Sequence, residues 1–378
     1  QPWRGPLHGI PYGVKDMLAT AGGIPTTWGA APLKDQQFKE DASVIRFLGA
    51  SGAVLVGKLA MVELAGGGGY RQPNASLTGP GRNPWNPERW TGGSSSGSAA
   101  AVACGAVPFA IGSETRGSIL GPASYCGVVG VRPTYGLVSR HGAMALSWSM
   151  DKIGPIARTV ADCARVLEVI GVPDPADPTS SGRHFRFRPE GFADRRLRFG
   201  LLTAETEAAD PEVRAAIVGL VPLLEQIGAV SEVRLPDLPY GDVARITIAS
   251  EAASFFEDFI ESGKLGELTA PEDRVIPYAF ETILAKDYLR AQRIRGRIAR
   301  LLAELFTTVD LLVAPTMRQT APPIDRPWAT AASRDSGADL NAASNLAGLP
   351  AVSLPVGLDS QGLPIGVQLV AGAFQDEA

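Results

Sequence analysis

Short apolar runs alternate with amphipathic segments along most of the chain. Residues 53–57 (AVLVG) and 308–315 (TVDLLVAP) have the length and composition of buried strands. Residues 159–170 (TVADCARVLEVI) space their apolar side chains at helical intervals behind a threonine, which predicts a capped helix. Because helical patterns repeatedly lead into buried strand patterns, the sequence predicts an α/β fold.

The same signals predict the remaining elements. Helices are expected over residues 41–48, 99–103, 210–228, 240–262, 279–306 and 340–346, and strands over 107–111, 128–131, 230–235, 351–356 and 365–370. Prolines and glycines predict a turn-rich segment before Lys15 and irregular structure over residues 79–92. No fixed-period repeat is visible, so we predict one α/β domain over residues 1–378, with a helical excursion over about residues 171–306.

The composition limits the classes of partner. Of 378 residues, 45% are hydrophobic and 20% charged, which is ordinary for a globular protein with a large core. The formal net charge is -4 and no basic block stands out, so the sequence predicts neither a nucleic-acid partner nor a membrane partner. The chain begins at Gln1 and stops soon after a strand-like run, so we expect both natural ends to be missing.

Cysteine and histidine usage argues against thiol and metal chemistry. The three cysteines are odd in number and lack CxxC spacing, which predicts reduced packing thiols and a cytoplasmic location. The three histidines are widely separated and show no metal-binding spacing. We therefore expect neither a metal nor an organic cofactor.

A glycine- and serine-rich stretch over residues 91–134 is the candidate for chemistry. It lacks the lysine of a phosphate-binding loop, so nucleotide binding is not expected. Residues 93–97 formally match G-x-S-x-G with Ser95 as nucleophile. That motif needs a preceding strand and a histidine, yet residues 87–90 are a poor strand and only His141 and His184 are available. We therefore consider Ser95 the weaker candidate.

The stronger candidate nucleophile is Ser118, which needs no histidine. It follows Thr115-Arg116-Gly117, a turn whose consecutive N–H groups could converge on one oxyanion. Lys15 lies in an apolar setting that would lower its pKa by desolvation and so make it a usable base. Ser94 could relay the proton between the two.

Four stretches resemble the amidase signature family of serine hydrolases. They cover residues 5–16 (GPLHGIPYGVKD), 92–134, 152–162 (KIGPIARTVAD) and 345–368. The resemblance implies a single domain with a central mixed β-sheet flanked by helices on both faces. It also implies a triad in which Lys15 is the base, Ser94 the relay serine after a cis peptide bond, and Ser118 the nucleophile. The oxyanion donors would be the backbone N–H groups of Thr115, Arg116, Gly117 and Ser118.

Two departures concern the substrate rather than the triad. The usual DTGGSIR turn reads ETRGSIL here, so Arg116 replaces a glycine and Leu120 an arginine. The resemblance implies an amidase that hydrolyses an amide, and in some members a carbamate or ester, through an acyl-enzyme. We expect a small-molecule substrate and a monomer or homodimer. The alternatives are the glutaminase subunit of a tRNA-dependent amidotransferase, disfavoured by Arg116 and the absence of a basic patch, and an inactive binding protein.

Overall fold

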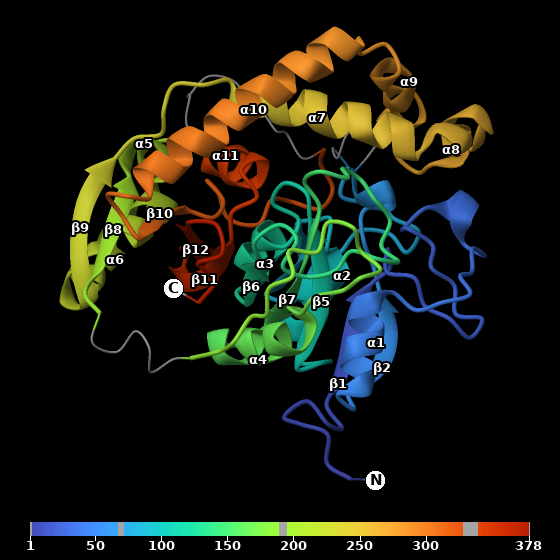
Figure 1. The fold of residues 1–378 in the computed structure, drawn as a ribbon, viewed down its shortest axis with the longest axis horizontal. Helices are drawn as coiled ribbons and strands as arrows, with labels where there is room; N and C mark the ends of the chain where they lie inside the picture. The colour runs from blue at the N-terminus through green and yellow to red at the C-terminus, as the bar shows by residue number, and fades with distance from the viewer. Residues whose placement is uncertain (1, 67–71, 189–194, 328–338, 378) are drawn as a thin grey trace.

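The buried strands form one ten-stranded sheet in the computed structural model, which describes residues 2–66, 72–188, 195–327 and 339–377 (Figure 1). The strands are β1 (Pro11–Lys15), β2 (Val54–Leu59), β5 (Phe109–Glu114), β6 (Val129–Arg132), β7 (Lys152–Ala157), β8 (Leu197–Leu202), β9 (Gly228–Val233), β10 (Leu311–Pro315), β11 (Ala351–Leu358) and β12 (Pro364–Ala371). Their order is β2-β1-β5-β7-β6-β11-β12-β10-β8-β9. Neighbours are parallel at both ends of the sheet and antiparallel from β5 to β10, so the predicted mixed sheet is confirmed.

Helices cover both faces of this sheet. They are α1 (Ser43–Ala50), α2 (Ser96–Ala103), α3 (Leu120–Cys126), α4 (Val160–Ile170), α5 (Thr203–Glu207), α6 (Pro211–Ile227), α7 (Tyr240–Phe255), α8 (Glu257–Glu261), α9 (Ile276–Phe280), α10 (Ala285–Leu305) and α11 (Leu340–Leu346). Alternate residues of a strand point to opposite faces. On β5, Phe109 and Ile111 pack with α1 and α4, while Ala110 packs with α2 and α3.

The helix patterns of the sequence are largely confirmed. The hydroxyl of Thr159 accepts the backbone N–H of Asp162 and caps α4 as predicted. The two longest predicted helices are each interrupted, the first at Phe256 between α7 and α8, and the second between α9 and α10. α7 and α10 pack side by side across the top of Figure 1 and form a helical arm between β9 and β10. None of the described helices is long and apolar enough to cross a lipid bilayer.

Of two predictions about irregular structure, the one for residues 79–92 is wrong, and the turn-rich prediction before Lys15 holds only for residues 6–9. Residues 79–92 contain a hairpin of β3 (Arg82–Asn83) and β4 (Asn86–Trp90), held in place by the buried side chain of Trp90. The glycine- and proline-rich segment before Lys15 contains β1, which lies between β2 and β5 with four of its five residues buried. Partners on both sides override the local turn signals of this segment.

Candidate active site

Lys15 lies at the carboxyl end of β1 and is completely buried. Its Nζ donates to the hydroxyl of Ser94 at 2.6 Å and to the hydroxyl of Ser113 at 2.9 Å. Ser113 belongs to β5, the parallel neighbour of β1. The sheet therefore positions the amine, and the two hydroxyls satisfy a group that would otherwise be buried without partners.

Burial lowers the pKa of Lys15 from 10.5 to about 7, while the negative charges of Asp151 and Glu114 act in the opposite direction. Desolvation penalises the charged ammonium more strongly than these carboxylates favour it. The uncharged amine is therefore accessible near neutral pH. An uncharged amine 2.6 Å from a hydroxyl can accept that hydroxyl's proton.

Ser94 lies in the loop that precedes α2, and the Gly93–Ser94 peptide is cis, as expected. The carbonyl of Ser94 accepts the N–H of Val62 at 3.2 Å, which fixes the loop against the segment after β2. Gly97 allows α2 to approach this segment, because a Cβ there would lie 2.5 Å from the backbone nitrogen of Ala60. Close backbone packing thus places the Ser94 hydroxyl beside Lys15.

The turn that carries Ser118 connects β5 to α3 and lies against the same loop. The N–H of Ser95 donates to the carbonyl of Ser118 at 3.2 Å, so the segments of Ser94 and Ser118 are adjacent. No hydrogen bond joins the Ser118 hydroxyl to Ser94 or Lys15 among the described residues. Gly117 has a φ of 85°, and a Cβ there would lie 2.8 Å from Nδ2 of Asn341.

The turn of residues 115–118 has backbone N–H groups that no described acceptor occupies. Within the described part of the chain, the N–H groups of residues 115–118 donate to no other protein group. The left-handed conformation of Gly117 is one that lets consecutive N–H groups converge on an anion. The four predicted donors are therefore free to bind a developing negative charge.

The carboxylate of Glu114 holds the end of this turn in place through hydrogen bonds, a function that the sequence did not reveal. One carboxylate oxygen accepts the N–H groups of Ile119 and Leu120, at 2.9 and 3.0 Å. The other accepts from Arg132 at 2.8 Å and from Asn345 at 3.0 Å. Burial alone would raise the pKa of Glu114, but the charge of Arg132 and these hydrogen bonds lower it to about 2.

Asp151, immediately before β7, also supports the turn, a role that the sequence did not reveal. It accepts the Thr115 hydroxyl at 2.5 Å and the N–H of Ser147 at 3.0 Å. Burial raises its pKa, against the effect of these two hydrogen bonds. A charged residue beside the apolar run of β7 is the signal that could have revealed it, because buried charges are rare without partners.

The helical arm is tied to the same region through the loop that precedes Asp151. Glu251 of α7 accepts the hydroxyl of Ser147 at 2.6 Å, and both the N–H and the hydroxyl of Ser149 at 2.9 and 2.7 Å. Arg295 of α10 donates to the hydroxyl and carbonyl of Ser149. A continuous hydrogen-bonded path therefore runs from the arm through this loop to Thr115.

Arg116 forms an ion pair with Asp339 at 2.5 Å, and their side chains are 30% and 22% exposed. Asp339 also accepts the N–H of Ala342 and so caps α11. The start of α7 faces the pair, since a Cβ on Gly241 would lie 3.8 Å from an atom of each side chain. The turn that carries Ser118 thus has a cation at a partly open position, paired with an anion at the start of α11.

The alternative nucleophiles find no support. Ser95 is fully buried, and its hydroxyl donates to the carbonyl of Ser113. β4 does precede it, contrary to prediction, but β4 pairs with β3 in a separate two-stranded sheet. Cys126 and Cys163 are buried, and burial raises the pKa of both thiols. Cys104 is exposed, so the prediction of a packing thiol is wrong there.

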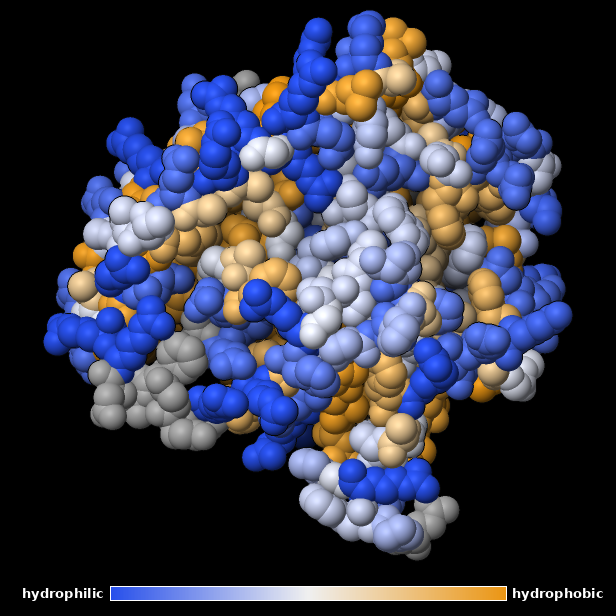
Figure 2. All heavy atoms as spheres, viewed as in Figure 1, coloured by the Kyte–Doolittle hydropathy of each residue, from blue (hydrophilic) through white to orange (hydrophobic). Residues whose placement is uncertain are grey.

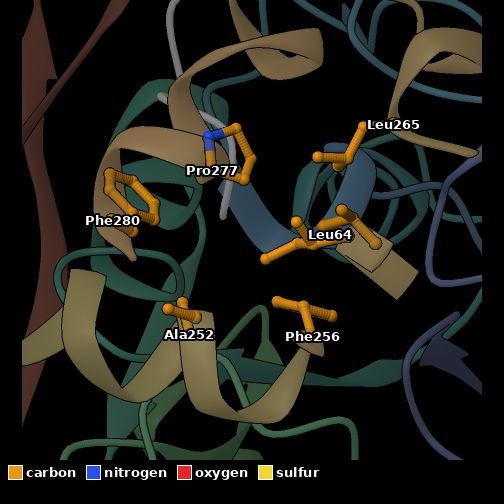
Figure 3. A pocket seen from close by; sticks show the side chains of 8 residues that line it. Leu64, Ala252, Phe256, Leu265, Pro277 and Phe280 are labelled. Atoms are coloured by element: carbon orange, nitrogen blue, oxygen red, sulfur yellow. The ribbon is translucent and has the colours of Figure 1, made fainter. Parts of the chain in front are cut away.

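A small apolar cavity lies between the arm and η2 (Glu63–Gly66) (Figure 3). Leu64, Phe256 and Phe280 are among its lining residues, and its volume is about 10 Å³. This is roughly the minimum for one water molecule, so the cavity does not accommodate an amide substrate. The sequence predicts pocket walls over residues 66–70, 148–151 and 171–313, and residues 67–70 of the first lie outside the described residues. In the described ranges no three His, Cys, Asp or Glu side chains are placed to bind a metal ion.

Comparison with known proteins assigns the chain to a family. The protein-family model "Amidase" matches residues 1–378, and the chain belongs to this amidase signature family. A curated relative from Picosynechococcus sp., one of the subunits of glutamyl-tRNA(Gln) amidotransferase, is 38% identical over 404 residues. The alignment covers 99% of this chain and 82% of that relative.

Solved structures of two kinds share the fold. The corresponding glutamyl-tRNA(Gln) amidotransferase subunit from Thermotoga maritima is 34% identical with a TM-score of 0.84, over 98% of this chain and 81% of that one. Peptide amidase from Stenotrophomonas maltophilia is 31% identical with a TM-score of 0.81, over 99% and 81%. The family therefore includes both an amidotransferase component and an amidase.

Proposed function

We propose that this protein hydrolyses an amide C–N bond through an acyl-enzyme on Ser118, with Ser94 as proton relay and Lys15 as base. The observation that carries the proposal is the contact of 2.6 Å between the buried Lys15 amine and the Ser94 hydroxyl, beside the Ser118 turn. The lowered pKa of Lys15 supports it, because the base must be uncharged.

The proposed reaction has two halves. Oγ of Ser118 attacks the carbonyl carbon, its proton passes to Oγ of Ser94, and the Ser94 proton passes to Nζ of Lys15. The tetrahedral oxyanion accepts N–H groups of residues 115–118, each worth roughly 3–4 kcal/mol in comparable sites. Lys15 returns the proton by the reverse path to the leaving nitrogen, and the C–N bond breaks. Water then attacks the acyl-enzyme by the same route and releases the acid.

The first experiment compares Ser118→Ala with Ser95→Ala in purified protein, using a panel of anilides, aliphatic amides, glutamine, carbamates and esters. We expect Ser118→Ala to lose at least 1,000-fold in kcat, which is roughly the scale of a lost nucleophile. We expect Ser95→Ala to keep most of its activity, because its hydroxyl contacts backbone. A serine-reactive phosphonate should label wild type at Ser118. Full activity of Ser118→Ala would refute the assignment.

A second, narrower candidate is the glutaminase activity of a tRNA-dependent amidotransferase. The sequence alone ranked it behind a simple amidase, but the name of the Picosynechococcus relative and the Thermotoga structure now favour it. The Arg116–Asp339 pair supports it further. Glutamine carries a carboxylate and an ammonium group, which a neighbouring cation and anion can bind separately.

Arg116→Ala distinguishes the two candidates. If glutamine is the substrate, the variant should raise KM for glutamine at least tenfold and leave kcat for a neutral aryl amide nearly unchanged. Equal effects on both substrates, or no ammonia released from glutamine by wild type, would leave the simple amidase as the better candidate. For the simple amidase, a small-molecule amide substrate, a monomer or homodimer and no nucleic-acid contact stay predictions, whereas the glutaminase candidate implies partner subunits. The absence of a cofactor and a cytoplasmic location stay predictions for both.

A further inference from the structure

A single row of positive charge follows the outer face of α10. Its members are exposed: Lys286, Arg290, Arg293, Arg297 and Arg300. The spacing alternates between four and three residues, which places all five side chains within an arc of about 80° on a helix of 3.6 residues per turn. At a rise of 1.5 Å per residue the row is about 21 Å long.

The arginines of this row are not neutralised within the described residues. Lys286 pairs with Asp287, but none of the four arginines forms an ion pair or side-chain hydrogen bond with another described group. The opposite face of α10 is apolar and packs through Ala291, Ile298 and Leu302. Figure 2 shows strongly hydrophilic residues along the upper edge of the molecule, where Figure 1 places α10.

A solvated helix usually mixes both signs, because neighbours three or four residues apart then attract each other. Here the five basic residues are one another's neighbours three or four positions apart, so like charges repel along the row until Glu304, which follows Arg300 by four residues. The formal net charge of the protein is -4, so the row concentrates positive charge on one helix of a chain that is acidic overall.

We propose that this row binds an acidic helical segment of a partner protein. A row of acidic residues with the same alternating spacing on a second helix has the same rise per residue. Its carboxylates therefore stay opposite the basic side chains along the whole row, as the charges that flank the core of a coiled coil do. Leu289 lies beside the row and is 57% exposed. A protein segment can cover this side chain with apolar atoms, whereas a phosphate backbone offers none. The surface is thus one for protein rather than RNA, and this inference is independent of the chemistry at Ser118.

The test uses a synthetic helical peptide of about 20 residues, with glutamates at alternating spacings of three and four and leucines between them. Fluorescence anisotropy at low ionic strength measures its binding to wild type, to Arg290→Glu/Arg293→Glu/Arg297→Glu, and to a matched control. The control, Arg158→Glu/Arg165→Glu/Arg234→Glu, reverses three exposed arginines elsewhere and changes the net charge equally.

We expect the α10 variant to bind the peptide at least tenfold more weakly and the control less than twofold more weakly. A second peptide with lysines in place of the glutamates should bind the α10 variant and not wild type. Unchanged amide hydrolysis and circular dichroism would show that both variants fold. Equal losses in the two variants would overturn the proposal. Binding of unmodified tRNA by wild type and by the control variant, but not by the α10 variant, would also overturn the proposal.

Discussion

Lys15 carries the most direct pH prediction. Its pKa in the folded protein is lowered to about 7, and the proposed base is the uncharged form. The rate should therefore be low near pH 5.5, rise about tenfold per pH unit below pH 7, and level off by about pH 8.5. Lys15→Arg should be inactive throughout, because a guanidinium does not lose its proton.

The measurement is kcat/KM for the best substrate from pH 5 to 9, with circular dichroism at each pH to exclude unfolding. A flat profile for wild type would remove Lys15 as the titrating base.

The environment of Lys15 was only partly predictable from the sequence. Its apolar neighbours along the chain indicated desolvation, but its contact with the hydroxyl of Ser113 depends on the pairing of β1 with β5.

Glu114 yields a prediction about stability. In Glu114→Gln the guanidinium of Arg132 stays fully buried without its carboxylate. Leaving one partner of a buried pair uncompensated typically costs about 3–5 kcal/mol in the free energy of unfolding. Urea unfolding checks this, with Glu232→Gln on the exposed side of β9 as control. A loss below about 1 kcal/mol would show that the pair does not anchor the turn.

At the scale of elements, the contact between η2 and η5 (Glu272–Arg274) depends on a proton. Asp273 is 1% exposed, and burial together with neighbouring Glu63 and Glu272 raises its pKa to about 8. The carboxylate of Glu63 accepts the N–H groups of Thr269 and Ala270, at 2.9 and 3.0 Å. Asp273 is therefore the residue of this contact that holds a proton.

The sign of the effect on stability follows from linkage. Between about pH 4 and 8 the folded state keeps a proton on Asp273 that the unfolded state releases, so stability falls as pH rises. Asp273→Asn, which resembles the protonated form at every pH, should be more stable than wild type at pH 8.5 and show a smaller difference at pH 5.5. Thermal melts at both values measure this, with Asp258→Asn as an exposed control. A constant difference would contradict the prediction.

Elements with one dominant periodicity were predictable from the sequence, and those that depend on distant partners were not. α4 and α11 carry their own caps and apolar stripes. β7 contains Gly154 and Pro155, which are ordinary turn residues, yet it lies between β5 and β6. Gly154 is needed there because a Cβ would overlap the carbonyl oxygen of Val131 on the neighbouring strand.

At the scale of the whole molecule, Glu251 connects the helical arm to the oxyanion turn. Glu251→Ala removes four hydrogen bonds, three of them to the loop before Asp151 and one to Tyr288. Small displacements of a catalytic group can cost about 100-fold in rate, so we expect kcat/KM to fall roughly 10- to 100-fold. Asp242→Ala is the matched control on α7, because Asp242 forms only an exposed pair with Arg245. Equal activity of the two variants would show that the arm does not support the turn.

The proposed triad and its oxyanion donors all precede residue 119, whereas Asp339, Asn341 and the arm that face Arg116 come from beyond residue 239. A recombinant of two family members with a crossover between these two regions would therefore take its proposed catalytic residues from one parent and the residues that face Arg116 from the other. Such exchange offers a simple route by which one catalytic apparatus could come to act on many substrates.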